Sequence, residues 1–128
     1  MVEKEMNKKA EKLKIYVAGP YQPKNCSLHD ASRVAQRNTD KAIEVGNALI
    51  EKGHYPFIPH LSHFIHIHYS CKRDYFEWWY EYDNTFLNNW ADALFFIAPS
   101  HGATNELELA KKLGLKIFYR LSEVPKAK

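Results

Sequence analysis

Short apolar segments alternate with longer amphipathic ones along most of this chain, and this alternation constrains the fold more than any other feature. The apolar segments read as strands and cover residues 14–20, 54–60, 92–99 and 115–119. Helix patterns, with apolar or small residues at spacings of three and four, fill residues 32–52, 76–90 and 104–113. Strands that alternate with helices favour parallel pairing through right-handed crossovers. The sequence therefore predicts a doubly wound α/β domain of the Rossmann or flavodoxin type, with four to five parallel strands and helices on both faces.

Length and charge indicate one domain without a polymer partner. We expect a charged extension over residues 1–13, a domain over 14–120 and a tail over 121–128 of the 128 residues. The net charge of +3 comes from the two ends, since residues 1–14 hold five lysines and three glutamates and the last four hold two lysines. A basic groove for a nucleic-acid polymer is therefore not expected.

Segments that would direct the chain to a membrane or out of the cell are not found in the sequence. No apolar run approaches the ~18 residues of a membrane span, and residues 1–14 lack the apolar core of a signal peptide. These features predict a cytoplasmic protein in which Cys26 and Cys71 are reduced.

Three loops are expected at the carboxyl edge of the sheet, where ligands of such folds bind. They are AGPYQP after the first strand, PHLSHF after the second and PSHGATNE after the third. The third passes into a helix whose free N–H groups and dipole favour an anion. Ser100 and His101 could add side-chain donors.

The third loop leads to two acids in what we expect to be the first turn of a helix that starts near Thr104. At ~100° per residue, Glu106 and Glu108 point about 200° apart. The expected buried stripe of Leu107, Ala110 and Leu113 puts Glu106 over the sheet edge and Glu108 outside. The alternative interpretation is that both acids only complement the helix dipole.

Three blocks carry a resemblance to a known family. They are IYVAGP, YDNTFLNNWAD and SHGATNELELAKKLG, the last with the pattern S-x-G-x-x-x-E-x-x-x-A-x-x-x-G. In this order and spacing the chain resembles the nucleoside 2-deoxyribosyltransferase superfamily over roughly residues 14–119. That superfamily includes the 2′-deoxynucleoside 5′-monophosphate N-glycosidases, and PHLSHF with its following aromatic helix is similar to a separate branch of it.

The resemblance implies roles for four residues. Glu106 would be the nucleophile that captures the anomeric carbon as the N-glycosidic bond breaks, and we expect it to be ionised at neutral pH. Tyr16 would orient Glu106, and Asp83 would contact the base and help to protonate it. Asp92 matches the second Asp of its block and would bind substrate; the alternative is a structural turn residue.

The position six residues before Glu106 bears on the substrate. Transferases that act on free nucleosides carry an Asp there, whereas this chain resembles the nucleotide hydrolases in having Ser100. A Ser beside backbone amides can hold a 5′-phosphate that an Asp would repel. Gly19, Tyr21 and Gly102 could add backbone donors or walls to a site for a nucleoside monophosphate.

Four histidines lie close together in PHLSHFIHIHY: His60, His63, His66 and His68. No Cys or carboxylate stands at a familiar metal spacing, so an aromatic wall or a subunit contact is favoured over a metal site. His60 is the one expected to reach the base. Trp78, Trp79, Tyr80 and Tyr82 are predicted to contribute to an oligomer interface or a lid.

These features together predict a cofactor-independent hydrolase that converts a nucleoside monophosphate to free base and sugar 5-phosphate. The resemblance also implies a homodimer or larger homo-oligomer. The alternatives are a deoxyribosyltransferase that exchanges bases, a non-catalytic nucleotide-binding module and a histidine-cluster metal protein.

Overall fold

Four parallel strands form the centre of the molecule in the order β2-β1-β3-β4. The computed structural model describes residues 11–21, 28–62 and 75–127. Within them the strands are β1 (Lys14–Ala18), β2 (Tyr55–Phe57), β3 (Ala93–Phe96) and β4 (Lys116–Phe118). The chain leaves β1 toward β2, then crosses back over β1 to reach β3, so the direction of winding reverses between β1 and β3.

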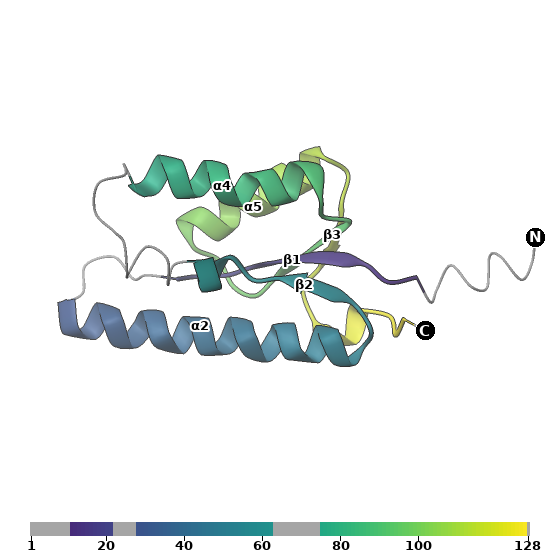
Figure 1. Ribbon diagram of the computed structural model, residues 1–128, viewed down its shortest axis with the longest axis horizontal. Helices are drawn as coiled ribbons and strands as arrows, with labels where there is room; N and C mark the ends of the chain where they lie inside the picture. The colour runs from purple at the N-terminus through teal and green to yellow at the C-terminus, as the bar shows by residue number, and fades with distance from the viewer. Residues whose placement is uncertain (1–10, 22–27, 63–74, 128) are drawn as a thin grey trace, which may run out of the picture.

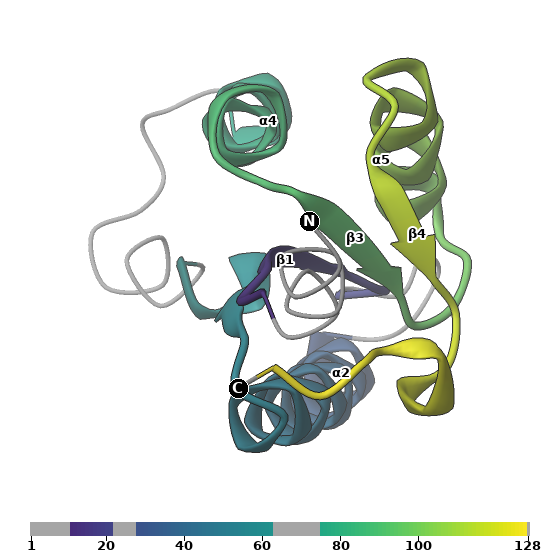
Figure 2. The same cartoon turned by 90° about the vertical axis from the view of Figure 1, so that its right-hand side faces the viewer.

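Helices cover both faces of this sheet, as Figures 1 and 2 show. Helix α2 (Leu28–Glu51) lies on one face, while α4 (Tyr75–Asn89) and α5 (His101–Lys112) lie side by side on the other. Two 3-10 turns, η1 (Pro59–Ser62) and η2 (Leu121–Glu123), follow β2 and β4. The doubly wound α/β fold predicted from the sequence is confirmed, with four strands.

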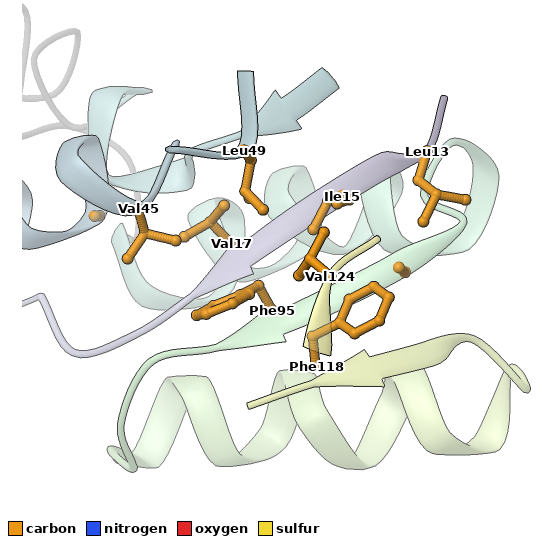
Figure 3. Packing of buried hydrophobic residues seen from close by; sticks show 10 residues of the cluster. Leu13, Ile15, Val17, Val45, Leu49, Phe95, Phe118 and Val124 are labelled. Atoms are coloured by element: carbon orange, nitrogen blue, oxygen red, sulfur yellow. The ribbon is translucent and has the colours of Figure 1, made fainter. Parts of the chain in front are cut away.

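Side chains of β1 and β3 alternate between two apolar layers because successive residues of a strand point to opposite faces. Ile15 and Val17 join the cluster under α2, shown in Figure 3, together with Val45 and Leu49 of that helix. The opposite layer, toward α4 and α5, consists of Tyr16, Ala18, Leu87, Leu94, Ala103, Leu107 and Ala110. Tyr16 is therefore a phenol in the middle of an apolar layer.

The start of α5 differs from its prediction. The helix begins at His101 rather than near Thr104, because the Ser100 side chain accepts a hydrogen bond from the backbone N–H of Ala103 and caps it. Glu106 therefore stands in the second turn and Glu108 at the start of the third, where the helix dipole acts weakly. Leu113, predicted to be buried, is 41% exposed and is the C-cap residue of α5.

The C-terminal segment that follows β4 packs against the rest of the described structure. Val124 is buried in the layer under α2, and the backbone N–H of Ala127 donates to the carbonyl of Lys52. His54, 2% exposed, links this segment to β1. Its Nδ1 accepts from the N–H of Leu13 at 3.0 Å, while its Nε2 donates to the carbonyl of Pro125 at 2.6 Å.

Among the helices of the described residues, none combines the length and apolar character needed to cross a membrane.

Candidate active site

The candidate site lies beside the point where the winding of the sheet reverses. Ligands of doubly wound sheets bind at such points, outside the carboxyl ends of the strands. Three side chains predicted to be catalytic meet here, and each comes from a different element. Tyr16 is on β1, Asp83 on α4 and Glu106 on α5.

Tyr16 and Glu106 are joined directly. The Tyr16 hydroxyl donates a hydrogen bond to Oε2 of Glu106. The Tyr16 side chain is 0% exposed and packs against Phe57 of β2, with the ring centroids 5.5 Å apart. Since the ring is held by this packing, the hydrogen bond favours one orientation of the Glu106 carboxyl. The role of Tyr16 in orienting a nucleophile stays a prediction. Glu108 is exposed, which confirms the predicted difference between the two acids.

Asp83 completes the group from α4. It is 8% exposed and interacts electrostatically with both Glu106 and Tyr16. Its Oδ1 is buried without a hydrogen-bond partner. An unpaired buried carboxyl oxygen costs free energy in an empty site, and such groups are typical of positions that meet a ligand.

Burial sets the protonation of this group. The pKa of Glu106 is raised to about 8, chiefly because burial removes solvent from the carboxyl. The hydrogen bond from Tyr16 lowers this pKa, and the charge of Asp83 raises it further. Loss of solvent also raises the pKa of Asp83 to about 7. The pKa of Tyr16 lies well above its usual range, chiefly because the phenol is buried, so it remains a donor.

Burial therefore opposes the expected ionisation of Glu106 in the free site, because it raises the pKa of this carboxyl. That expectation relied on a place in the first turn of α5, near the positive end of the helix dipole. Because α5 starts at His101, Glu106 is one turn further on, and desolvation dominates.

Ser100 and Gly102 lie at the start of α5, where both were predicted to contact an anion. The Ser100 oxygen accepts the capping hydrogen bond at 3.0 Å, and its own hydroxyl proton can still be donated. Gly102 is exposed, and a Cβ added there would meet no atom within 4 Å. The space above this helix start is therefore open.

The loop after β1 and the turn after β2 come together. The His60 ring, 3% exposed, bonds through Nε2 to the Pro20 carbonyl at 2.8 Å and meets the ring of Tyr21 edge-on at 5.8 Å. Since a carbonyl can only accept, Nε2 carries the proton and Nδ1 is an acceptor, which has no partner. Burial lowers the pKa of His60 and keeps it neutral. Gly19 packs against Ile97, where a Cβ would come within 3.1 Å.

Asp92 does not join the site. It precedes β3 at the amino edge of the sheet, opposite to the carboxyl ends, and its Oδ2 accepts from the backbone N–H of Lys14 at 3.0 Å. This position fits the alternative interpretation of Asp92, a structural residue that ties β1 to β3.

Two further residues of α4 lie near the site and were not predicted to belong to it. Tyr80 interacts electrostatically with Tyr16, and Asn84 has a buried, unpaired Oδ1. Both lie on α4: Tyr80 is three residues before Asp83, and Asn84 directly follows it. The buried residues of α4 are Trp79, Asp83 and Leu87, at spacings of four, and Tyr80 and Asn84 each directly follow one of them, at the border of this inner face. From the sequence, Tyr80 is predicted only to contribute to an oligomer interface or a lid.

Aromatic rings connect the site to the surface of α4. Phe57 stacks on Phe86 at 3.9 Å, Phe86 contacts Tyr82, and Tyr82 stacks with Trp78 at 5.5 Å. Trp79 is buried whereas Trp78 is 42% exposed. The predicted lid or oligomer interface at these residues stays a prediction.

No cluster of three or more potential metal ligands occurs within the described ranges. Of the four histidines in the cluster, His60 lies within the described residues, whereas three lie outside them: His63, His66 and His68. The role of the cluster therefore stays a prediction.

Comparison of the chain with models of protein families gives no match, and comparison with curated proteins gives no significant match. The relation to the nucleoside 2-deoxyribosyltransferase superfamily therefore remains a prediction from the three sequence blocks.

Proposed function

We propose that this protein is an N-glycosidase that hydrolyses a ribo- or deoxyribonucleoside 5′-monophosphate to free base and sugar 5-phosphate. The convergence of Tyr16, Asp83 and Glu106 beside the switch point of the sheet carries this proposal. Cleavage of an N-glycosidic bond can use one carboxylate that captures the sugar and one acid that protonates the leaving base, and the phenol can orient the first of these groups.

Each group has a role in the proposed reaction. Glu106 as carboxylate attacks the anomeric carbon as positive charge develops on the sugar, and the C–N bond breaks. Asp83 gives a proton to the departing base, whose bonding pair would otherwise leave as a poor anionic group. Water then attacks the glycosyl ester, Asp83 takes its proton, and Glu106 is released. Tyr16 holds Glu106 in line throughout.

The phosphate preference rests on the start of α5. Free backbone N–H groups of the first turn and the Ser100 hydroxyl are donors that suit a phosphate. The open space over Gly102 is compatible with this assignment, because a Cβ placed there would meet no atom within 4 Å.

The direct test is base release from matched nucleosides and nucleoside monophosphates, with Glu106→Gln and Glu108→Gln proteins alongside. The exposed Glu108, on the same helix, is the control for a general loss of negative charge. Release from monophosphates that is lost only in Glu106→Gln is the expected result. No release from any substrate by the wild type would contradict the proposal and leave a nucleotide-binding module.

A second base added to the same assay separates the alternatives among enzymes. A hydrolase yields sugar 5-phosphate whether or not a free acceptor base is present. A transferase would instead convert the acceptor to a new glycoside faster than it forms the free sugar, and that outcome would replace hydrolysis with base exchange.

A further inference from the structure

Two neighbouring side chains of α4 carry buried oxygens that have no hydrogen-bond partner among the described residues. They are Oδ1 of Asp83 and Oδ1 of Asn84. A buried polar atom without a partner costs free energy, so each one calls for a partner that the fold itself does not supply. The proposed reaction gives Asp83 a proton to deliver to the leaving base, but it gives the amide of Asn84 no task.

Helical geometry turns Asn84 toward the candidate site. The side of α4 toward β2 is marked by Phe86, which stacks on Phe57 at 3.9 Å. Asn84 precedes Phe86 by two residues and so lies about 200° around the helix from it, on the side of α5, which runs beside α4 in Figure 2. Tyr80, one turn earlier on this side, interacts electrostatically with Tyr16 of β1. The Asn84 amide is therefore directed to the space between α4, α5 and β1.

We propose that Asn84 determines the base specificity of the site: its amide oxygen accepts a hydrogen bond from an exocyclic amino group of the base, while Asp83 meets a ring nitrogen on the same edge. The substrate class is then a nucleoside 5′-monophosphate with an amino base, cytosine or adenine. This inference deepens the proposed function and rests on it, because it names the base that the reaction releases.

The hydrogen-bonding edges of the bases explain this choice. Cytosine carries an acceptor nitrogen, N3, beside its 4-amino donor, and adenine carries N7 on the same edge as its 6-amino donor. An acid that protonates the ring nitrogen and an amide oxygen that accepts from the amino group match both bases. Uracil, hypoxanthine and guanine have a carbonyl oxygen where these bases have the amino group. That carbonyl would face the amide oxygen of Asn84, acceptor against acceptor, and would leave it unpaired.

Helix α4 holds the two oxygens in a fixed relation to the rest of the site. Successive helical side chains diverge by ~100° and do not face each other, so Asp83 and Asn84 can contact two separate atoms of one planar edge. Leu87, one turn further on, is 1% exposed and packs in the same layer as Leu107 of α5. This packing sets the position of α4 beside α5, which carries the proposed nucleophile.

The test uses pairs of substrates that differ in an amino against an oxo group: cytidine with uridine 5′-monophosphate, and adenosine with inosine 5′-monophosphate. Base release by the wild type should favour the amino member of each pair by at least about tenfold in kcat/KM. Asn84→Leu removes the amide at similar size and should lower this ratio by about tenfold. Asn88→Leu is the matched control, because Asn88 is exposed on the same helix, and it should leave the ratio unchanged.

Affinities for the same four nucleotides separate recognition from turnover. They are measured by isothermal titration calorimetry in proteins that also carry Glu106→Gln, so that the proposed nucleophile is absent. An amino preference in affinity that Asn84→Leu abolishes would sustain the role of Asn84 even if the wild type released no base, and would then refute the hydrolase alone. Base release without an amino preference would do the reverse.

Two further results would overturn the inference. A preference for the oxo members would mean that the amide presents its nitrogen, not its oxygen, to the base. An amino preference that persists in Asn84→Leu would assign the unpaired oxygen of Asn84 to the packing of α4 against α5. Near-ultraviolet circular dichroism establishes that each variant is folded, and Asn84→Ala, which only truncates the side chain, replaces Asn84→Leu if the larger residue is not accommodated.

Discussion

The hydroxyl of Tyr16, in the middle of β1, donates a hydrogen bond to Oε2 of Glu106 in α5, 90 residues further along the chain. This bond joins the central strand to the helix that begins at the proposed phosphate site. It also gives the polar phenol, which stands in the apolar layer under α4 and α5, a hydrogen-bond acceptor. The donor leaves one carboxyl oxygen of Glu106 engaged and the other available for chemistry.

Removal of this hydroxyl is expected to impair base release far more than folding. Tyr16→Phe keeps the ring against Phe57, but Glu106 loses the hydrogen bond that favours its ionised form. A hydrogen bond to a charged group contributes about 1.5–3 kcal/mol, so kcat/KM at pH 7 should fall roughly 10- to 150-fold. The acid limb of the pH–rate profile should also move to higher pH.

Tyr55→Phe is the matched control for that measurement, because Tyr55 is 51% exposed on β2 and lies outside the site. It should leave the pH–rate profile unchanged. An unshifted acid limb in Tyr16→Phe would show that the phenol does not act on the ionisation of Glu106.

Stability is expected to fall as the pH rises through neutrality. The folded-state pKa values of Glu106 and Asp83, about 8 and about 7, lie above the ordinary value of ~4 of an unfolded chain. Between these values the folded state binds more protons, so the stabilising contribution is complete below pH ~4 and is lost as the pH approaches 8. Each group lowers the free energy of unfolding by up to about 1.4 kcal/mol per pH unit within this window.

Urea denaturation from pH 5 to pH 8 measures this dependence. The double variant Glu106→Gln, Asp83→Asn removes both groups and should show a flatter profile than the wild type. A wild type that gains stability relative to the double variant over the same range would contradict the raised pKa values.

The fold was predictable from the sequence because its signals are local. The alternation of apolar strands with 3.6-period helices, and the Gly and Pro residues between them, identify each element within a few residues. Gly53, for example, ends α2 with a φ of +94°. The orientation of Glu106 against Glu108 also followed from helical geometry alone.

The electrostatics of the site were not predictable, because they depend on contacts between distant elements. Ser100 caps α5 three residues earlier than expected, which moves Glu106 out of the first turn and into a desolvated position. Asp92 shows the same limit, since only the register of β1 beside β3 reveals that it meets the backbone of Lys14. The burial of Val124 likewise depends on η2 returning the chain to α2.

Substitution of two glycines should separate stability from ligand binding. Gly102→Ala puts a methyl group into open space in the first turn of α5, where Ala favours the helix by up to about 1 kcal/mol. We therefore expect unchanged or higher stability, but weaker binding of monophosphates than of the matching nucleosides relative to the wild type. Isothermal titration calorimetry with both ligand sets measures this difference.

Gly114→Ala should instead lower the stability and leave the ligand preference unchanged. Gly114 has a φ of +74° after the end of α5, a conformation that costs an L-residue roughly 1–2 kcal/mol. The variant should lose stability while the ratio of monophosphate to nucleoside affinity stays that of the wild type. If Gly102→Ala leaves that ratio unchanged too, the start of α5 does not hold the phosphate.

The C-terminal segment should contribute to folding stability through Val124. This side chain is 2% exposed and packs with Leu13, Ile15 and Phe118 beneath the sheet (Figure 3). Val124→Ala removes two methyl groups from a packed layer, which should lower the free energy of unfolding by roughly 1–3 kcal/mol. Ile50→Ala is the control, because Ile50 is 59% exposed on α2 and its loss should cost no more than about 0.5 kcal/mol. Urea denaturation of the two variants at one pH makes the comparison, and equal costs would mean that residues 121–127 do not belong to the cooperative fold.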